Sequence, residues 1–521
     1  MTARRLMTSG RRGEAGRTRG TPRVLVGAAI SLMLAAGAWA DDLGREISGV
    51  LTRAKLGTAR VGISIVDVQS GATLAEMRSG EGFIPASNMK LLTSGAALRT
   101  LGADYEFHTR LVQVGNALVV EGSGDPAFGD PELLKDMGMG SGEFITKLVE
   151  AVSNTVGAGV GGEVAPSFRE VIVDDRVFDR QAVHPTWPAD QLNRWYCAQV
   201  SGLTFHANVL WLYAWPAAKE GEQPRLKTEP SAPWLEITNR ARTVRTQTTT
   251  LWADRERGTN RFNVHGALRG ALEEPIEVCL DQPAGVFGRL LAEKLGAAGL
   301  GKPVWRMAGL DEQIGTERKV LAVVQTPISQ VLERCNGDSH NLYAEALIKL
   351  IGHQITQQPG SWTNGAAVIR MQLRDKVGPS AAAAVNIADG SGMSRDNKVT
   401  PGVLSAWLAS MSQDAAVADS FIESIPVAGE EGSVKKRFRN SKLANEVRAK
   451  SGYINGVRCL SGYVTDTASG RQIAFSILVN EIPANVSGQR VKEFHEDVVE
   501  LIDKRLSEKV RAAGEREAVG G

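Results

Sequence analysis

Cysteine and histidine are scarce in this chain, and their scarcity limits the chemistry that it can carry. Among 521 residues there are four cysteines and seven histidines. The cysteines are widely separated, no Cys-x-x-Cys pair occurs, and the ligand spacing of a metal site is absent. In an oxidising compartment one pair could form a disulfide; four buried, unpaired thiols are the alternative. The positions are Cys197, Cys279, Cys335 and Cys459.

Beyond its first 40 residues, the chain has no excess of positive charge. The whole chain has a formal charge of +2. Residues 1–40 hold seven arginines and a single acidic residue, Glu14, so the remainder holds 53 basic and 57 acidic residues and has a net charge of −4. A nucleic-acid partner therefore has no electrostatic support, and we expect none.

Long hydrophobic runs are missing outside the leader. A basic segment ends at Arg23, an apolar stretch covers Val24–Trp39, and a small-x-small sequence ends at Ala40. This order predicts a signal peptide over residues 1–40, cut after Ala40, and a periplasmic or secreted protein. The apolar stretch is short for a membrane span. An uncleaved anchor is the alternative, so we expect at most peripheral membrane association.

The rest of the chain is long enough for two or three domains, because one hydrophobic core rarely serves so many residues. Ala59–Asp67 and Leu74–Met77 predict two strands joined by a turn, and alternating apolar residues predict that the first strand is half-buried. An amphipathic helix is expected next. Its apolar side would be formed by Met89, Leu91, Leu92, Ala96 and Leu98.

The pattern of predicted strands and helices changes at two points in the remaining sequence. Residues 104–320 are rich in strand-like segments between glycine, proline and polar turns, which predicts an inserted, mostly β region of one or two modules. Residues 321–507 return to helices and end in antiparallel strands over Glu446–Val464 and Gln472–Val479. The expected organisation is a signal peptide (1–40), a discontinuous domain (41–103 and 321–507), the insertion (104–320) and a flexible tail (508–521).

A serine and a lysine stand three residues apart where the first predicted helix begins. The stretch PASNMKLLT at Pro85–Thr93 contains Ser87 and Lys90. Residues three apart share a helical face, so the amine can lie beside the hydroxyl. A serine hydroxyl is a weak nucleophile that an adjacent base activates. By itself the pattern is uninformative, since Ser-x-x-Lys arises by chance in most long chains.

A second polar motif, Ser339-His340-Asn341, precedes a predicted helix at residues 342–354. Ser339 and Asn341 are two residues apart, so their side chains can converge on one cavity. The alternative is that Ser339 is only the N-cap of the helix. His340 lies between them, and we assign it no role.

A third motif, Lys450-Ser451-Gly452, lies on one of the predicted C-terminal strands. It offers a cation and a hydroxyl at a strand edge, followed by a glycine that lets another backbone approach closely. These features suit the binding of a peptide carboxylate. An exposed turn is the alternative when the motif is taken alone.

In this order the three motifs resemble the active-site set of penicillin-binding proteins and serine β-lactamases. The long segment between the first and second motifs makes the chain similar to the class C low-molecular-mass penicillin-binding proteins, the D-alanyl-D-alanine carboxypeptidase/endopeptidase family. The similarity spans residues 42–506, and that family usually has threonine where this chain has Ser451. Further matching sequences are GSGDPAF at Gly122–Phe128, DGSGMSRDN at Asp389–Asn397 and AKSGYINGVRCLSGYV at Ala449–Val464.

The resemblance implies an α/β (α+β) fold: a penicillin-binding, serine β-lactamase-like transpeptidase domain, with an antiparallel sheet and helices, that carries the insertion. It also implies catalytic roles. Ser87 would be the nucleophile, Lys90 its base, with a pKa lowered by burial and by the neighbouring Lys450, and Ser339 a proton relay. Asn341 would hold Lys90 and the substrate amide.

Substrate-binding roles follow from the same resemblance. Lys450 and Ser451 would bind the substrate carboxylate. The oxyanion would lie between the N–H groups of Ser87 and of Tyr453, which follows Gly452. Arg395 would contact the peptide stem; a structural pairing with Asp396 or Asp389 is the alternative.

The implied activity is that of a serine D-Ala-D-Ala carboxypeptidase, with endopeptidase action left open. Peptidoglycan stem peptides would be substrates, β-lactams would be covalent inhibitors, and no metal or cofactor is needed. A non-catalytic peptidoglycan-binding or β-lactam-sensing relative is the alternative, although such relatives usually lose a motif residue. A β-lactamase is disfavoured by the long insertion. A Ser-His-Asp hydrolase is disfavoured because no histidine stands in a triad context and no Gly-x-Ser-x-Gly occurs.

Overall fold

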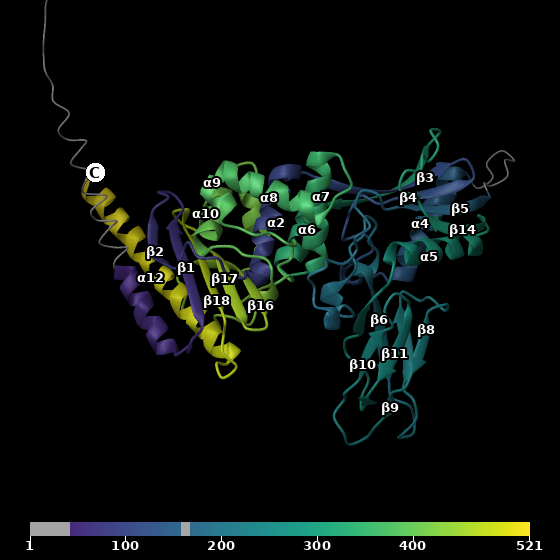
Figure 1. Cartoon of the computed structure of the whole chain (residues 1–521), viewed down its shortest axis with the longest axis horizontal. Coiled ribbons are helices and arrows are strands. Elements are labelled where there is room, and N and C mark those ends of the chain that lie inside the picture. Colours follow the sequence, from purple (N-terminus) through teal and green to yellow (C-terminus); the bar gives the residue numbers. More distant parts are fainter. Residues whose placement is uncertain (1–41, 158–166, 521) are drawn as a thin grey trace, which may run out of the picture.

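The computed structural model describes residues 42–157 and 167–520. The predicted signal peptide and its cleavage site lie outside the described residues. Within those two ranges, no helix combines the length and the apolar character that crossing a membrane requires. The first described element is a helix over residues 42–54, which packs beside the C-terminal helix in Figure 1.

A five-stranded antiparallel sheet forms the centre of one half of the molecule, in the order β16-β17-β18-β1-β2 (Figure 1). The N-terminal strands therefore pair with the last strands of the chain. The turn at Asn455-Gly456 joins β16 to β17, and Gly456 adopts the positive φ of 74° that such turns favour. The strands are β1 (Arg60–Asp67), β2 (Thr73–Met77), β16 (Glu446–Ile454), β17 (Val457–Asp466) and β18 (Arg471–Asn480).

Helices cover both faces of this sheet. Helix α10 (Pro401–Ser412) packs on one face, and α12 (Gly488–Gly520) packs on the other. Ile63 and Ile65 of β1 face the α12 side, whereas Val66 belongs to the core on the α10 side. The prediction of a half-buried β1 was therefore wrong, because alternate residues of the strand enter two different cores.

A cluster of helices lies between the sheet and the rest of the molecule. Helix α2 runs through its middle and is buried on every side from Met89 to Leu98, in contact with α6, α7, α8 and α10. The expected amphipathic helix therefore has no face exposed to solvent there, and its polar residues Lys90, Thr93 and Ser94 are buried too. The elements of the cluster are η1 (Ala86–Asn88), α2 (Met89–Leu101), α6 (Ile328–Asn336), α7 (Asn341–Thr356), α8 (Trp362–Lys376), α9 (Pro379–Ala383), α11 (Ala418–Glu423) and η5 (Gly432–Val434).

The inserted region contains a second five-stranded sheet, in the order β14-β5-β4-β3-β15. Strand β15 pairs with β3, so the sheet of the insertion continues past the expected boundary at residue 320 to Pro327. Helices α4 and α5 pack together, and α5 packs on the sheet. The elements are β3 (Glu106–Val114), β4 (Ala117–Glu121), β5 (Phe168–Asp174), β14 (Gly301–Met307), β15 (Lys319–Pro327), α3 (Pro131–Asp136), α4 (Ser141–Val156) and α5 (Pro283–Ala297).

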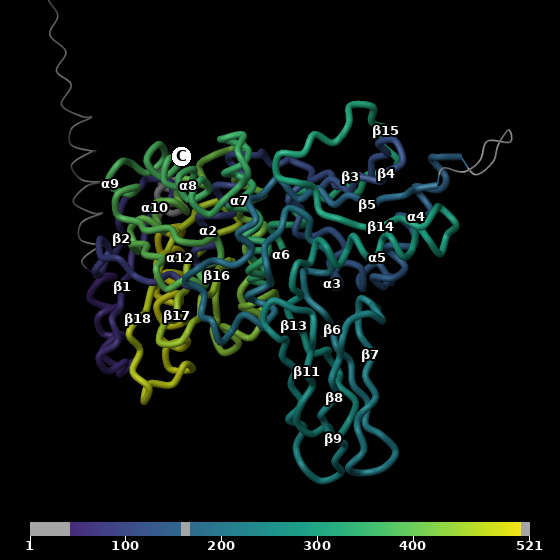
Figure 2. Tube along the Cα trace, turned by 45° about the vertical axis from the view of Figure 1, so that its right-hand side comes forward, coloured from purple at the N-terminus to yellow at the C-terminus, as the bar shows by residue number. Residues whose placement is uncertain are grey.

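A smaller module of short strands projects from this sheet (Figure 2). Its strands form three small sheets, with the orders β13-β6-β7, β10-β11-β8 and β12-β9. The insertion thus has two parts, one mixed and one all-β, so the expectation of a mostly β region missed α4 and α5. The elements are β6 (Val209–Trp215), β7 (Arg225–Glu229), β8 (Glu236–Asn239), β9 (Arg242–Thr243), β10 (Trp252–Arg255), β11 (Arg261–His265), β12 (Ala267–Leu268), β13 (Ile276–Cys279), η2 (Ala189–Gln191), η3 (Trp195–Cys197) and η4 (His206–Asn208).

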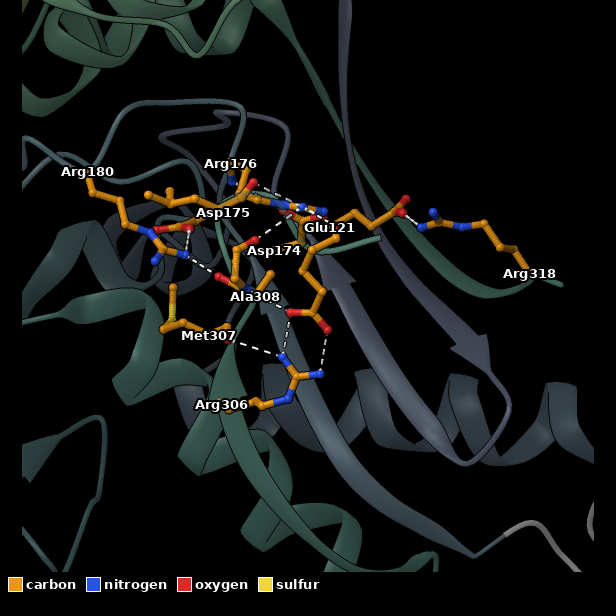
Figure 3. A network of polar contacts seen from close by, with 12 residues as sticks. Glu121, Asp174, Asp175, Arg176, Arg180, Arg306, Met307, Ala308 and Arg318 are labelled. Carbon is orange, nitrogen blue, oxygen red and sulfur yellow. Dashed lines mark hydrogen bonds and ion pairs between the residues drawn. The ribbon is translucent and has the colours of Figure 1, made fainter. Parts of the chain in front are cut away.

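Ion pairs close the end of strand β5 (Figure 3). The Asp174 carboxylate accepts a hydrogen bond from Arg176 Nη2 over 2.7 Å, and Asp175 pairs with Arg180 over 3.3 Å. On the neighbouring strand, Arg306 donates to Glu170 over 2.8 Å. Each of these carboxylates is occupied by an arginine, so the cluster fixes the sheet rather than offering an open acidic site.

Two other expectations concern the cysteines and the C-terminus. All four cysteines are buried and unpaired, which is the second of the two alternatives. The charged segment after Glu508 was expected to be a flexible tail, but α12 continues through it to Gly520. Arginine, alanine and glutamate dominate this segment, and all three have high helix propensity.

Candidate active site

The three sequence motifs meet where β16, the start of α2 and the start of α7 come together. Lys90 Nζ lies 3.2 Å from Ser87 Oγ and donates a hydrogen bond to Asn341 Oδ1 over 2.7 Å. Lys450 Nζ donates to Ser339 Oγ over 2.8 Å. Two amines and two hydroxyls are thus placed around one point, although the motifs are more than one hundred residues apart in the chain.

A strained turn presents Ser87. The residue lies in η1, and Ala86 before it has a positive φ of 45°, which costs an L-residue about 1 kcal/mol or more. Contacts with Lys450 of β16 and with Gly392 hold this turn in place. Asn88 Nδ2 donates to the Lys450 carbonyl over 2.5 Å, and Gly392 packs so tightly that a Cβ there would lie 1.8 Å from the Ala86 carbonyl oxygen. Ser87 itself remains half-buried.

Lys90 is fully buried, and burial lowers its pKa to about 8. Cys335, Glu345 and Asp389 lie close enough to oppose this shift. Burial raises the pKa of the Cys335 thiol to about 11, so this group is uncharged near neutral pH. The carboxyl groups of Glu345 and Asp389 are therefore the groups that oppose the lowering of the Lys90 pKa. An amine with a pKa near 8 is neutral in a useful fraction of molecules, as a general base must be.

The loop that contains the DGSGMSRDN sequence supplies a further contact to Lys90. The Ser391 carbonyl accepts a hydrogen bond from Lys90 Nζ over 3.1 Å. Glu345 holds this loop, because its carboxylate accepts from the N–H groups of Gly390 (2.9 Å) and Ser391 (2.8 Å). Burial raises the pKa of Glu345 to about 7. Sequence reasoning missed both contacts: Ser391 acts through its backbone, and Glu345 acts through its carboxylate but lies outside the three motifs.

Ser339 is not the N-cap of helix α7. That position belongs to His340, whose side chain makes no capping bond, and Ser339 has a positive φ of 63° one residue earlier. This conformation turns the Ser339 hydroxyl to Lys450. The alternative that Ser339 is only the N-cap of the helix was therefore wrong.

His340, to which no role was assigned, packs among aromatic side chains. Its ring packs 5.4 Å from Trp195 and 4.9 Å from Tyr343, measured between ring centroids. Burial and the charge of Arg334 lower its pKa to about 3. The ring is therefore neutral throughout the physiological range and cannot exchange protons there.

Asn341 connects the site to the inserted region. Its Nδ2 donates a hydrogen bond to the Tyr196 carbonyl over 2.8 Å, while its Oδ1 accepts from Lys90. Tyr196 lies in η3, on a segment of the insertion that reaches α7. No residue of this segment was predicted to lie in the site.

Gly452 lets strand β16 lie against the backbone of the turn that contains Ser87. A Cβ at this position would be 2.9 Å from the Pro85 carbonyl oxygen and 3.1 Å from the Ser87 nitrogen, which is closer than ordinary contact. Tyr453, the next residue, is 62% exposed. Ser451 Oγ lies 3.1 Å from Ser433 Oγ.

Lys450 is fully buried as well, and its pKa is lowered well below the usual value by burial and then by the charge of Lys90. Lys450 was expected to lower the pKa of Lys90. Burial lowers the pKa of Lys90 as expected, and the mutual repulsion of the two amines is evident in the lowered pKa of Lys450. Lys450 Nζ donates to Ser339 Oγ and to the Ser451 carbonyl oxygen, both of which are uncharged acceptors.

Arg395 lies near the turn between β16 and β17. Its Nη1 donates to the Asn455 carbonyl over 2.9 Å, and it is exposed. It pairs with neither expected partner. Asp389 instead accepts hydrogen bonds from Trp187 Nε1 and from the Ser394 amide. The alternative of a structural pairing between Arg395 and Asp396 or Asp389 was therefore wrong.

The arrangement is suited to acyl transfer by a serine. Within residues 42–157 and 167–520, no cluster of histidine, cysteine, aspartate or glutamate has the geometry to hold a metal ion. The polar groups available are a hydroxyl beside a buried amine, a second buried amine with its own hydroxyl, and a carboxamide. This set matches the requirements of an activated nucleophile.

The fold and the site together define a serine peptidase with a penicillin-binding fold. The family model for the D-Ala-D-Ala carboxypeptidase 3 (S13) family matches residues 43–504, and the chain belongs to this family. It is similar to the D-alanyl-D-alanine carboxypeptidase of Actinomadura sp. strain R39, at 32% identity over 475 residues, which cover 88% of this chain and 85% of the relative. The family predicted from the motifs is confirmed.

More distant similarities agree. A carboxypeptidase of Mycobacterium tuberculosis is 25% identical over 431 residues, which cover 81% of this chain and 76% of that protein. The crystal structure of penicillin-binding protein 4 from Haemophilus influenzae superposes with a TM-score of 0.68 at 18% identity, and the match covers 87% of this chain and 97% of that one. The structural match confirms the predicted fold class.

Proposed function

We propose that Ser87 is the nucleophile of a D-Ala-D-Ala carboxypeptidase that acts on peptidoglycan stem peptides. The observation that carries the proposal is the 3.2 Å separation of Ser87 Oγ from Lys90 Nζ, an amine whose pKa burial lowers to about 8. An uncharged amine at this distance can take the hydroxyl proton as the oxygen attacks a carbonyl carbon.

Acylation then proceeds in steps that these residues can serve. Ser87 Oγ bonds to the carbonyl carbon of the terminal peptide bond, and its proton passes to Lys90. The C–N bond breaks, and the proton that Lys90 received passes to the departing amine of D-alanine by way of Lys450 and Ser339, which share a hydrogen bond. An ester on Ser87 remains. Water hydrolyses this ester and frees the shortened peptide together with the serine hydroxyl.

The oxyanion of each tetrahedral intermediate is assigned to the N–H groups of Ser87 and Tyr453. The close approach of β16 at Gly452 to the Ser87 nitrogen supports this assignment. Two aligned N–H donors stabilise developing negative charge where water is excluded. Asn341 is the positioning residue, because it holds Lys90 with one end of its amide and the Tyr196 carbonyl with the other.

Lys450 and Ser451 are proposed to bind the free carboxylate of the substrate. Lys450 is buried with a lowered pKa, so an incoming carboxylate would restore its charge and form a charge-assisted hydrogen bond. Serine in place of the threonine usual in the family keeps the hydroxyl donor. A contact between Arg395 and the peptide stem is proposed on the resemblance of its loop alone.

The proposal includes covalent inhibition by β-lactams, which carry both a reactive carbonyl and a carboxylate. A Haemophilus influenzae penicillin-binding protein 4 with a similar fold has been solved in complex with a β-lactam. A periplasmic or secreted location is proposed from the leader in residues 1–40, and such a location gives access to the cell wall.

Fluorescent penicillin tests the nucleophile. The purified chain is expected to become covalently labelled, and Ser87→Ala is expected to lose the label while it keeps the melting temperature. Ser380→Ala is a suitable control, because Ser380 is an exposed residue of helix α9. Equal labelling of Ser87→Ala would refute the assignment.

Muropeptides test the reaction. Release of D-alanine from a pentapeptide would establish carboxypeptidase action, and cleavage of cross-linked dimers would establish endopeptidase action. Labelling by penicillin with no cleavage of either substrate would favour the alternative of a β-lactam-sensing relative.

A further inference from the structure

A groove lined by two tryptophans lies in the inserted region, outside the active site. A hollow of about 390 Å³ separates the small module from helix α5, with Trp234 and Arg261 on the module side and Arg289 and Trp305 on the other. A second hollow of about 470 Å³ shares Arg289 and Trp305 with the first, so the two adjoin along α5. Figure 1 places α5 above β8, at the side of the molecule away from β18.

The indole ring of Trp305 packs on helix α5 at a glycine. It projects from β14 onto helix α5, where Gly285 and Gly288 are one turn apart. A Cβ at Gly285 would lie 2.9 Å from indole Cζ3, and a Cβ at Gly288 would lie 3.6 Å from indole Cε3. Glycine is unfavourable inside a helix, and at Gly285 it is explained by the ring that it accommodates. At Gly288 a Cβ would first meet Val173 Cγ2, 2.6 Å away, so this glycine lets the helix approach β5. The residue is still 37% exposed, which leaves part of the indole open to the groove.

Trp234 is fixed by polar contacts to the same helix. Its Nε1 donates a hydrogen bond to Glu293 Oε2 over 3.1 Å, and the Arg289 guanidinium carbon lies 4.1 Å from the ring centroid. Both indoles are therefore oriented before a ligand arrives, which lowers the entropy cost of binding.

The charges in the first hollow cancel in pairs. Arg261 pairs with Glu236 over 2.9 Å, and Arg289 pairs with Glu293 over 3.2 Å. The remaining charged residue of this hollow, Asp281, lies 3.4 Å from Arg255. An anion or a cation would have to compete with these pairs. A neutral ligand rich in hydroxyl and amide groups would not.

We propose that this groove binds the glycan strand of the cell wall, as a neutral oligosaccharide of N-acetylated amino sugars. Pyranose rings have an apolar face of C–H groups that packs on an indole, and an equatorial rim of hydroxyls that suits paired polar side chains. The inference rests on the proposed function, because the stem peptides are attached to such a strand. The groove anchors the enzyme on the glycan while Ser87 acts on the peptide.

Calorimetric titration of the full chain with a tetramer of N-acetylglucosamine tests the proposal. Trp305→Ala is expected to weaken binding at least about tenfold, and Trp305→Phe to weaken it less, because a smaller ring remains. Trp252→Ala is the matched control and should leave binding unchanged. Trp252 lies in β10 of the small module, is 46% exposed and stacks on His265, outside the groove.

Fluorescent penicillin labelling of every variant is measured in parallel and should be unchanged. Absence of sugar binding by the unaltered chain, or equal binding by Trp305→Ala, would overturn the proposal, as would binding of free stem peptide in place of the sugar. If Trp305→Ala fails to fold, Trp305→Phe and Arg289→Ala decide the matter. Normal labelling without sugar binding refutes the groove alone, whereas sugar binding without labelling refutes the catalytic proposal alone.

Discussion

Lys90 Nζ and Asn341 Oδ1 are 2.7 Å apart, although 251 positions separate the two residues in the chain. The other end of the Asn341 amide is occupied by the Tyr196 carbonyl, 2.8 Å from Nδ2. An amide that is bonded at both ends has one orientation, so its oxygen must face Lys90. The position of the amine therefore depends on a segment of the inserted region.

Replacement of Asn341 should remove the hydrogen bond that holds the Lys90 amine in place. We expect Asn341→Ala to lower the second-order rate constant of penicillin acylation about 100-fold, because Lys90 would lose its fixed position beside Ser87. Stopped-flow fluorescence would measure the rate. Asn154→Ala, at an exposed position of helix α4, should leave the rate unchanged. An Asn341→Ala rate within threefold of the original would contradict the positioning role.

The pH dependence of acylation should report the pKa of Lys90. The free amine is the active form and its pKa is about 8, so the neutral fraction falls about tenfold for each pH unit below that value. At saturating β-lactam, the limiting acylation rate constant should rise with this slope from pH 6 and level off near pH 8. A rate that continued to rise to pH 10 would indicate an ordinary lysine, and a flat profile would exclude Lys90 as the base.

Binding of a carboxylate should draw a proton onto Lys450. The pKa of this lysine is lowered in the free protein, and a bound carboxylate raises it, so the sign of the change is proton uptake. Calorimetry of Ser87→Ala with a D-Ala-D-Ala peptide, in buffers of different ionisation enthalpy at pH 8, would measure it. A peptide with a C-terminal amide should cause no uptake. Equal uptake with both peptides would refute the carboxylate site.

Gly452→Ala should separate the two proposed oxyanion donors. The added Cβ would press on the Pro85 carbonyl and on the Ser87 nitrogen, so β16 must move away. Loss of one such donor typically costs about 100-fold in rate, and overpacking about 1–3 kcal/mol in stability. Acylation rates and urea unfolding would measure both effects.

A matched glycine separates this effect from a general response to an added methyl group. A Cβ at Gly142, in helix α4, would meet no atom within 4 Å. Gly142→Ala should keep the acylation rate and raise the free energy of unfolding slightly, since alanine is the better helix former. An acylation rate for Gly452→Ala equal to that of Gly142→Ala would exclude the proposed role of the close approach.

Much of the catalytic half was predictable because its local signals are strong. The stretch predicted as strand over Glu446–Val464 is β16 and β17 in the structure, and its ends agree with theirs to within two residues. The motif residues Ser87, Lys90, Asn341 and Lys450 were expected together through their order in the chain. Their side chains have the chemical types that the reaction requires, which is why a motif can reveal them.

Other features leave no such signal. The Tyr196 and Ser391 carbonyls act through the backbone, which every residue possesses, so no residue type marks them. Burial of the second face of β1 depends on where α12 packs and not on the strand itself. Helix α4, by contrast, was missed although Ile145, Leu148, Val149 and Val152 have helical spacing, so a closer reading of the periodicity would have found it.

The pairing of β1 with β18 also sets the order in which the molecule can be completed. β1 is among the first elements to leave the ribosome or the export channel, and its partner, residues 471–480, is among the last. The sheet of the insertion has all its strands between residues 106 and 327 and can close earlier. A nascent or truncated chain that stops before residue 471 thus contains Ser87 but has an incomplete catalytic sheet, so reactivity toward penicillin should appear only when synthesis is almost finished.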